Sequence, residues 1–468
     1  MENMDRPDSR RPMKIAFSML LLCGVAGTAL AQTDPGVRGG AAGAGGPLVG
    51  LGGPDLQLFQ IAAKRFNEVD SVSGTVDDRT NTKAQVTGAG LGPSFNGTNC
   101  AECHSQPAVG GTGPAVNPQI RTATLDGATN TIPPFITANG PTREARFIRN
   151  PDGTPDGGVH DLFVITGRID AKPPLQPTTC TAVQPNFPQA IANNNISFRI
   201  PTPLFGLGLV ENTPDSNLVN DSAALAPLQS LVGISSGIFN RSGNDGTIMR
   251  FGWKSQNKSI GIFAGEAYAV EQGVTNDLFP NERTDQANCM FNGLPEDLAN
   301  ESPNTQTGLT FGASQFSSDV VNFTNFIRLA GAPVPVTPTA NDVAGFVLFE
   351  AVGCGLCHVA QHVTGKSAYG NQSFLTYTPF SDFALHDMGT GLQDQITQGA
   401  ANGLQFRTAP LWGIGQRVFF LHDGRTSDLL AAIEDHSSTG SEANTVISLF
   451  NILSASEKQD ILDFLRSL

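Results

Sequence analysis

One short pattern, Cys-x-x-Cys-His, occurs twice in the sequence and carries its clearest chemistry. Two thiols separated by two residues can reach the two vinyl groups of one porphyrin, and the histidine that follows can donate an axial nitrogen to the iron. The pattern therefore predicts two covalently bound c-type haems, each with one histidine as an iron ligand. The residues are Cys100, Cys103 and His104 in the first copy, and Cys354, Cys357 and His358 in the second.

Three other interpretations of these cysteines explain less. A zinc ribbon or finger would place its cysteine pairs about 12 to 20 residues apart, whereas about half of the chain separates these two pairs. A thioredoxin-type redox pair explains neither the second copy nor the histidines, and two structural disulfides also leave the histidines unexplained. Haem attachment is the interpretation that uses every residue of both copies.

The N-terminus has the features of a secretory signal peptide. Lys14 precedes an apolar run over residues 15–30, which ends in the small-x-small sequence Ala29-Leu30-Ala31. Such a run is short for a membrane span and is typical of an export signal that is removed. We therefore expect residues 1–31 to be a signal peptide, and the mature protein to be periplasmic without a stable membrane anchor.

Two further cysteines of the mature chain, Cys180 and Cys289, lie outside the repeated pattern. Disulfides form and persist in oxidising compartments such as the periplasm, so a bond between these two residues is the simplest expectation. It would close a loop of about a hundred residues and restrict the unfolded chain. A redox-active thiol pair is the alternative.

Composition excludes one class of partner and indicates a loop-rich globular protein. The 468 residues carry a formal net charge of -14 and contain no basic run, which argues against nucleic-acid binding through phosphate neutralisation. With 52 Gly and 31 Pro, the chain is richer than usual in residues that interrupt helices and strands. Its length is enough for two or three domains, each with its own core.

The elements that must position the two motifs can be placed along the chain. Helical spacing predicts a helix over residues 55–69, with Leu58, Ile61, Ala62 and Phe66 on one face. Asn341 is a candidate cap for a helix through residue 349 that leads into the second motif. Ser454 and Glu457 form a capping box for a last helix.

We therefore expect a mainly α protein with two cytochrome c-like haem domains and long loop-rich insertions. The Gly/Ala-rich residues 32–53 are predicted to be a flexible leader. Residues 54–335 would form an N-terminal haem domain with a large irregular insertion. A Pro-rich linker around residues 331–338 would then precede a C-terminal cytochrome c-like haem domain at residues 336–468.

Several stretches resemble one known family, the bacterial di-haem oxidoreductases, which are peroxidase-like proteins also named thiol oxidoreductases. This family is related to the di-haem cytochrome c peroxidases and to the enzyme that matures the methylamine dehydrogenase cofactor. Examples are Arg-Phe-Gly-Trp-Lys at residues 250–254 and Leu-His-Asp-Gly-Arg at residues 421–425. The other matching stretches are residues 90–96, 201–208, 271–276, 382–389 and 406–413.

The resemblance implies a periplasmic di-haem c-type oxidoreductase, peroxidase-like in its activity. One haem would exchange electrons with a small redox protein, and the other would react with a small-molecule oxidant such as peroxide. Two alternatives remain. An electron-transfer di-haem cytochrome would have no substrate and two six-coordinate irons, whereas a di-haem oxygenase would use the large insertion to shape a pocket for an organic substrate.

An electron-carrying haem keeps both axial positions of its iron filled, and a reactive haem leaves one open. Met388 follows His358 between glycines that allow its loop to fold over a porphyrin, so we predict Met388 as the sixth ligand of the second haem. His386 and His422 are the alternatives. Each of these residues can equally be a buried or surface side chain with ordinary hydrogen bonds.

Peroxide cleavage needs a group that moves a proton between the two peroxide oxygens, usually a carboxylate near the open haem. Glu211, Glu266 and Glu271 are the candidates, because each lies in an apolar or family-like stretch. The alternative for each is a solvated or structural carboxylate.

Three further residues have candidate roles around the haems. By resemblance to the related enzymes, Trp253 is a candidate electron relay between the two haems, and a core aromatic is its alternative. Arg407 and Arg425 can pair with haem propionates, since a guanidinium group binds a carboxylate through two parallel hydrogen bonds. Simple surface exposure is the alternative for both arginines.

Overall fold

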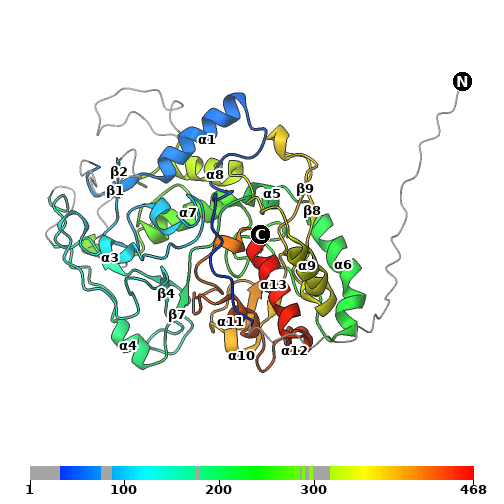
Figure 1. Cartoon of the computed structure of the whole chain (residues 1–468). Coiled ribbons are helices and arrows are strands. Elements are labelled where there is room, and N and C mark those ends of the chain that lie inside the picture. The colour runs from blue at the N-terminus through cyan, green and yellow to red at the C-terminus, as the bar shows by residue number, and fades with distance from the viewer. Residues whose placement is uncertain (1–31, 75–86, 174–178, 285–286, 290–294, 299–316) are drawn as a thin grey trace, which may run out of the picture.

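The structure is a computed structural model, and it describes residues 32–74, 87–173, 179–284, 287–289, 295–298 and 317–468 (Figure 1). The expected signal peptide, residues 1–31, lies outside them. No helix within the described residues is long and apolar enough to cross a membrane. Helices account for 34% of the structure and strands for 12%, so helix is the dominant regular structure although much of the chain is irregular.

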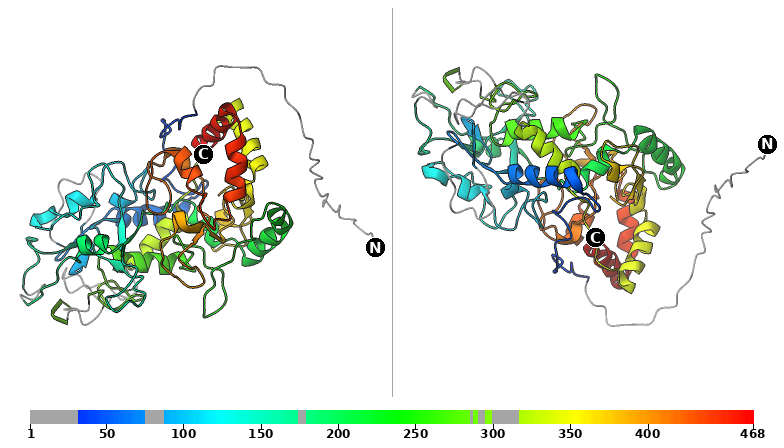
Figure 2. Two further views of the ribbon diagram at one scale, coloured as in Figure 1. Left: turned by 90° about the horizontal axis from the view of Figure 1, so that it is seen from below. Right: turned by 90° about the horizontal axis from the view of Figure 1, so that it is seen from above.

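Most of the longer helices lie in two groups on two sides of the molecule (Figures 1 and 2). Helices α1, α7 and α8 lie on one side, and α9, α12 and α13 lie on the other. The longer helices are α1 (Gly53–Phe66), α6 (Asp215–Leu231), α7 (Ile260–Glu271), α8 (Asp319–Leu329), α9 (Ala340–Val352), α12 (Asn444–Ile452) and α13 (Ala455–Ser467). The shorter helices are α2 (Cys100–Cys103), α3 (Gln119–Thr122), α4 (Phe187–Ala192), α5 (Leu207–Glu211), α10 (Gly389–Leu392) and α11 (Leu429–Glu434).

The described strands are short and pair locally rather than forming one sheet. The three-stranded sheet places β4 (Glu144–Arg146) between β5 (Val159–His160) and β7 (Ser197–Arg199), antiparallel to both. The parallel pair is β1 (Val69–Ser71) with β2 (Thr87–Ala89). The antiparallel pairs are β3 (Ser94–Phe95) with β6 (Phe163–Val164), β8 (His362–Val363) with β9 (Thr376–Tyr377), and β10 (Leu385–Asp387) with β11 (Gln405–Arg407).

Helix α1 packs on α8 through an aromatic face. Phe59, Ala62 and Phe66 are buried, and their spacing of three and four residues places them on one side of the helix. The ring centroids of Phe59 and Phe66 lie 5.6 and 4.4 Å from that of Phe326 on α8. The predicted helix is therefore present. The prediction of its inward face was partly wrong, because Ile61 is 54% exposed and Phe59 is buried in its place.

In the C-terminal part, α9 crosses α13 at close range. A Cβ atom on Gly345 would lie 1.9 Å from the Asp460 carbonyl oxygen, so only glycine allows this approach. The predicted helix before the second motif is present, but the predicted cap was wrong. Thr339 caps α9 in a capping box with Asp342, and Asn341 lies inside the helix.

The last helix begins as the sequence predicted, with a capping box between Ser454 and Glu457. Its inward side joins a buried core that is built almost wholly from residues after 345. This core has Phe349, Phe380, Ile414, Phe420, Leu429, Ala432, Phe450, Ile461, Leu462, Phe464, Leu465 and Leu468.

Residues 32–52 lie across both sides of the molecule instead of forming a flexible leader. The Asp34 carboxylate pairs with the Arg466 guanidinium group at 2.5 Å and accepts a hydrogen bond from the Leu429 N–H. These contacts satisfy polar groups that a Gly-rich segment would otherwise expose to water, which corrects the expectation drawn from composition. The backbone hydrogen bonds are Arg38 N to Gly415 O, Val334 N to Gly43 O, Gly331 N to Gly46 O, and Leu48 N to Leu329 O.

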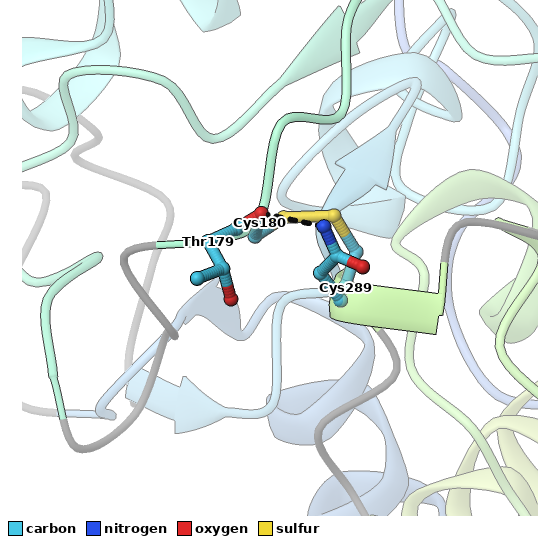
Figure 3. The surroundings of a disulfide bond; sticks show 4 residues. Thr179, Cys180 and Cys289 are labelled. Carbon is cyan, nitrogen blue, oxygen red and sulfur yellow. Dashed lines mark hydrogen bonds between the residues drawn. A yellow bond between two sulfur atoms is a disulfide. The ribbon is translucent and has the colours of Figure 1, made fainter.

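A disulfide joins Cys180 and Cys289, which confirms the simplest expectation for these cysteines (Figure 3). The bond connects an irregular segment at Cys180 to a short 3-10 helix, Ala287–Cys289, and the two cysteines are 109 residues apart in the sequence. The Asn288 side-chain amide beside it donates a hydrogen bond of 2.9 Å to the Thr179 carbonyl oxygen. Neither cysteine lines either of the two large cavities described below.

Replacing both cysteines by serine (Cys180→Ser with Cys289→Ser) is expected to lower the free energy of unfolding by about 2–4 kcal/mol, because the closed loop no longer restricts the unfolded chain. Denaturant unfolding of the oxidised protein and the double variant measures the difference. The visible haem spectrum should not change, since the bond is remote from both cavities. An unchanged midpoint would show that the bond contributes no stability.

Candidate haem-binding sites

The first Cys-x-x-Cys-His motif lines a cavity with an empty volume of about 1210 Å³. Cys100 and Cys103 lie on α2, which is capped by the Asn99 side chain accepting from the Glu102 N–H. His104 Nδ1 lies 2.9 Å from the Gly111 carbonyl oxygen. Thr202 is a second backbone partner of the ring. In the tautomer in which Nδ1 donates its hydrogen to Gly111, Nε2 keeps its lone pair. Burial lowers the pKa of His104 to about 4, so the ring is neutral and able to bind a metal.

The second motif repeats this arrangement in a cavity with an empty volume of about 1400 Å³. Gly353 ends α9 with a φ of 100°, a left-handed conformation that favours glycine, and Cys354 follows at once. His358 Nδ1 lies 2.9 Å from the Phe380 carbonyl oxygen, and burial lowers the pKa of His358 to about 4. None of the four motif cysteines forms a disulfide, and all four line their cavities.

Unpaired polar atoms at the first cavity fit a bound group that carries carboxylates. The Arg199 Nε and Thr142 Oγ1 atoms are buried and have no hydrogen-bond partner among the described residues, and both side chains line the cavity. Buried donors of this kind are costly unless a ligand satisfies them. Haem propionates would supply the missing acceptors.

The second cavity has two buried arginines that form no ion pair within the described part of the chain. Arg407 was predicted from the sequence, whereas Arg417 was missed because it lies in no motif. Burial lowers the pKa of both guanidinium groups to about 10, and they remain charged at neutral pH. Arg425 instead pairs with Asp423 and lines neither large cavity, so the structure does not support it as a propionate partner.

A pair of half-buried carboxyl groups faces the first cavity. Glu271 and Glu144 both line it and hydrogen-bond to each other. Burial and the neighbouring Glu144 raise the pKa of Glu271 well above its usual value. Burial also raises the pKa of Glu144, but Arg146 and Arg199 together lower this pKa by more. The net pKa of Glu144 is therefore below its usual value, and Glu144 stays a carboxylate. The pair therefore holds one proton on Glu271 beside the Glu144 carboxylate, which also accepts a hydrogen bond from the Arg146 guanidinium group.

Of the three predicted carboxylates, Glu271 and Glu266 reach the first cavity and Glu211 reaches neither large cavity. Glu211 pairs with Arg328 and accepts the Ile260 N–H, which is a structural role. Glu144 was missed because its partner, Glu271, is distant in sequence and the pair forms only when β4 reaches the end of α7.

His386 lines the second cavity but cannot offer a lone pair to iron. Its Nε2 lies 2.9 Å from an Asp382 carboxylate oxygen, and its Nδ1 lies 2.8 Å from a Glu442 carboxylate oxygen. Both nitrogens therefore carry hydrogens, because each faces an acceptor. Burial lowers the pKa of His386, but Asp382 raises it by more, and the pKa lies well above its usual value.

Met388 and His422 also line the second cavity. The His422 ring stacks on Phe406 with centroids 4.3 Å apart, and burial lowers the pKa of His422 to about 4. Met388 packs against the small apolar cluster of Ile200, Trp253 and Phe406. The position of Met388 is compatible with the predicted ligand role, which stays a prediction.

His436 was missed by the sequence analysis and shares the features of the two motif histidines. Its Nδ1 lies 2.7 Å from the Ala432 carbonyl oxygen, and the ring lines the second cavity. Burial lowers the pKa of His436, as it does that of His358, and both rings line the second cavity. The spacing from Leu429 and Ala432, the buried residues of α11, would have placed it on the inward face.

Trp253 separates the two cavities, because its side chain lines both. Trp253 is buried, with 7% of its surface exposed. Its indole N–H donates a hydrogen bond of 2.9 Å to the Ile200 carbonyl oxygen. The His422 ring lies 6.4 Å from it in an edge-to-face arrangement. Trp253 is therefore a core aromatic and also the shared wall of the two sites.

Comparisons with known proteins place the chain in a family. A family model described as "di-haem oxidoreductase, putative peroxidase" matches residues 154–468, which include the second motif but not the first. No curated protein matches the chain.

Two solved structures show a weak likeness. One is the hydrazine synthase of Kuenenia stuttgartiensis, with 18% identity, a TM-score of 0.22, and coverage of 32% of this chain and 57% of that one. The other is a MauG-like protein associated with microbial copper homeostasis, with 18% identity, a TM-score of 0.24, and coverage of 34% and 54%. These likenesses carry no argument about function, but the family model spans well over half of the sequence. The chain belongs to the di-haem oxidoreductase family.

Proposed function

We propose that the protein is a periplasmic di-haem c-type oxidoreductase of the peroxidase type. Residues 54–335 and 336–468 would each form a cytochrome c-like haem domain, with haem bound to Cys100 and Cys103 in one and to Cys354 and Cys357 in the other. One observation carries this proposal: two cavities share Trp253 as a wall but differ in polar content. The first holds the proton-carrying carboxyl pair, and the second holds additional histidines.

The first site is proposed to be the reactive one. Its axial ligand would be His104, and no other histidine and no methionine among the described residues lines this cavity. The bound haem would supply the open iron position and the electrons that cleave the O–O bond of hydrogen peroxide. The carboxylate of Glu144 accepts the proton of the near peroxide oxygen, and the carboxyl group of Glu271 protonates the far one.

This proton transfer accounts for the products. Reduction of hydrogen peroxide to two waters takes up two electrons and two protons. After one turnover the carboxyl pair has the same number of protons as before, because one carboxyl group gives a proton and the other receives one. The two further protons enter from solvent with the two electrons.

The second site is proposed to transfer electrons. His358 and His436 would be its axial ligands, because each ring donates Nδ1–H to a backbone carbonyl and keeps Nε2 for the iron. Arg407 and Arg417 would bind the propionates, and both also line a small cavity beside Trp253. Met388 is the alternative sixth ligand. Electrons would then cross Trp253 to the first site.

A spectroscopic titration tests the proposed function. Visible and electron paramagnetic resonance spectra of the purified protein, oxidised and half-reduced, should show one high-spin and one low-spin haem. Hydrogen peroxide should change only the high-spin signal. Two low-spin haems indifferent to peroxide in every redox state would instead indicate an electron carrier, and oxygen binding with consumption of an apolar substrate would indicate an oxygenase.

The proposed reductant is a small redox protein, and the net charge of -14 favours a basic one. We expect the rate of reduction by a basic cytochrome to fall about tenfold as ionic strength rises from roughly 0.01 to 0.15 M. An acidic cytochrome of similar potential is the control. Stopped-flow mixing measures both rates, and a salt-independent rate with the basic donor would exclude electrostatic steering.

A further inference from the structure

Tyr268 is a buried tyrosine at the first cavity that the proposed peroxide chemistry does not use. It lies on α7, is 2% exposed, and lines the cavity together with the motif residues. Its ring meets Phe323 edge to face, with centroids 5.0 Å apart. The hydroxyl group donates a hydrogen bond of 3.3 Å to a carboxylate oxygen of Asp319, and Asp70 is a second carboxyl group within its reach. A phenol is thus placed between the haem site and a base.

The carboxylate that accepts this hydrogen bond belongs to an acidic cluster formed by the buried Glu68 and Asp70 and the half-buried Asp319. Arg65 is its cation, 2.8 Å from Glu68 and 3.7 Å from Asp319. Burial raises the pKa of Asp319 above its usual value, although Arg65 opposes this. Burial also raises the pKa of Glu68 to about 7 and that of Asp70 well above its usual value. Asp319 is therefore a base with increased proton affinity.

The other two tyrosines of the chain, Tyr369 and Tyr377, neither line a large cavity nor donate to a carboxylate among the described residues. The Tyr369 hydroxyl donates to the Asn325 side-chain oxygen at 3.3 Å, and the Tyr377 hydroxyl lies 2.6 Å from the Thr213 hydroxyl. An amide and an alcohol do not accept a full proton at neutral pH. Neither tyrosine lines either of the two large cavities. Only Tyr268 combines a place at a haem cavity with a carboxylate partner.

We propose that Tyr268 is a redox-active residue that gives one electron to the peroxide-oxidised first haem site and its phenolic proton to Asp319. The proposal rests on the proposed function, because hydrogen peroxide is the oxidant. In this step the O–H bond of Tyr268 breaks and an O–H bond forms on Asp319. The haem site is reduced by one electron, and the products are a neutral phenoxyl radical and a neutral carboxylic acid.

The transfer of the proton makes the step feasible inside the protein. A tyrosine that lost only its electron would become a buried cation, which is unfavourable in a medium of low dielectric constant. Moving the proton to Asp319 leaves the tyrosine neutral and removes a buried negative charge. Tyr268 thereby supplies an electron at the first site when the second haem has none to give.

Rapid-freeze electron paramagnetic resonance after peroxide addition tests the proposal on the fully oxidised holoprotein. We expect a tyrosyl signal that narrows when the protein contains ring-deuterated tyrosine. Tyr268→Phe should abolish this signal, while Tyr369→Phe and Tyr377→Phe should retain it. Asp319→Asn keeps a hydrogen-bond acceptor but removes the base, and it should slow formation of the signal at least tenfold.

Each result decides one point. A tyrosyl signal that persists in Tyr268→Phe overturns the proposal. Reaction of the high-spin haem with peroxide but no tyrosyl signal in the wild-type protein overturns the proposal and leaves the proposed function intact. Absence of any haem reaction with peroxide overturns both. Unchanged visible haem spectra before peroxide addition show that each variant has folded.

Discussion

Glu271→Gln is expected to lower kcat/KM for hydrogen peroxide by about 10²–10⁴-fold, the usual contribution of a well-placed acid or base. Glutamine has a similar shape but cannot give a proton to the departing peroxide oxygen. Glu144→Gln should have a similar effect, because it removes the acceptor of the same pair. Steady-state peroxidase assays with a saturating electron donor measure both variants.

Glu266→Gln is the matched control for these variants. Glu266 lines the same cavity, but its carboxylate accepts a hydrogen bond from the Asn257 side-chain amide and not from the carboxyl pair. Its replacement should leave peroxide turnover within a few-fold of the wild type. Equal losses in all three variants would mean that the cavity tolerates no amide in place of a carboxyl group, and that Glu271 has no specific role as proton donor.

The carboxyl pair also determines whether kcat/KM for hydrogen peroxide rises or falls with pH. Because the pKa of Glu271 lies well above its usual value, Glu271 keeps its proton through neutral pH. The rate should fall as the pH rises through this raised pKa, since the proton donor is then lost. A pH profile of kcat/KM should show this alkaline loss in the wild type, and a rate that rises steadily with pH would exclude Glu271 as the acid.

The sequence predicted what depends on local patterns. The Cys-x-x-Cys-His motifs fix two cysteines and a histidine within one turn, and both copies line a cavity as expected. The capping box at Ser454 is also a local signal, because its partner Glu457 is three residues away. In each case the residues that make the feature are close in the chain, so tertiary packing has little influence on it.

Residues that meet only through tertiary packing were not predicted. Glu144 meets Glu271 across the first cavity, and Arg417 joins Arg407 at the second. His386 seemed a candidate ligand until the structure placed Glu442 and Asp382 against its two ring nitrogens. The partners of a side chain decide whether it is a ligand, an acid or an ion pair. Glu442 is 56 residues from His386 in the sequence, and although Asp382 is only four residues away, no local pattern shows that both carboxylates face the same ring.

Composition was misleading for the segment before α1. A run of glycine and alanine lacks side chains to form a core, and so it resembles a linker. In the structure its backbone groups bond to partners in two distant regions, and Asp34 anchors it to Arg466. Glycine and alanine have small side chains, which allow the backbone of this segment to approach those two regions closely. A Gly/Ala-rich composition therefore also suits an extended segment that packs on a protein surface.

His436→Ala is expected to convert the second haem from low-spin to high-spin, because the iron loses its second strong-field ligand. Visible and electron paramagnetic resonance spectra of the oxidised variant should then show two high-spin haems where the wild type shows one. The iron should also become able to bind small ligands at the vacated position. Added imidazole should enter the space left by the ring and restore the low-spin signal.

Met388→Leu is the decisive comparison, since Met388 lines the same cavity and was the ligand predicted from the sequence. If His436 is the ligand, leucine preserves the packing of Met388 and the second haem stays low-spin. If Met388 is the ligand, this variant loses the low-spin signal and His436→Ala keeps it. His386→Gln separates a third case, because the hydrogen bonds of His386 to two carboxylates predict that its loss leaves the spin state unchanged.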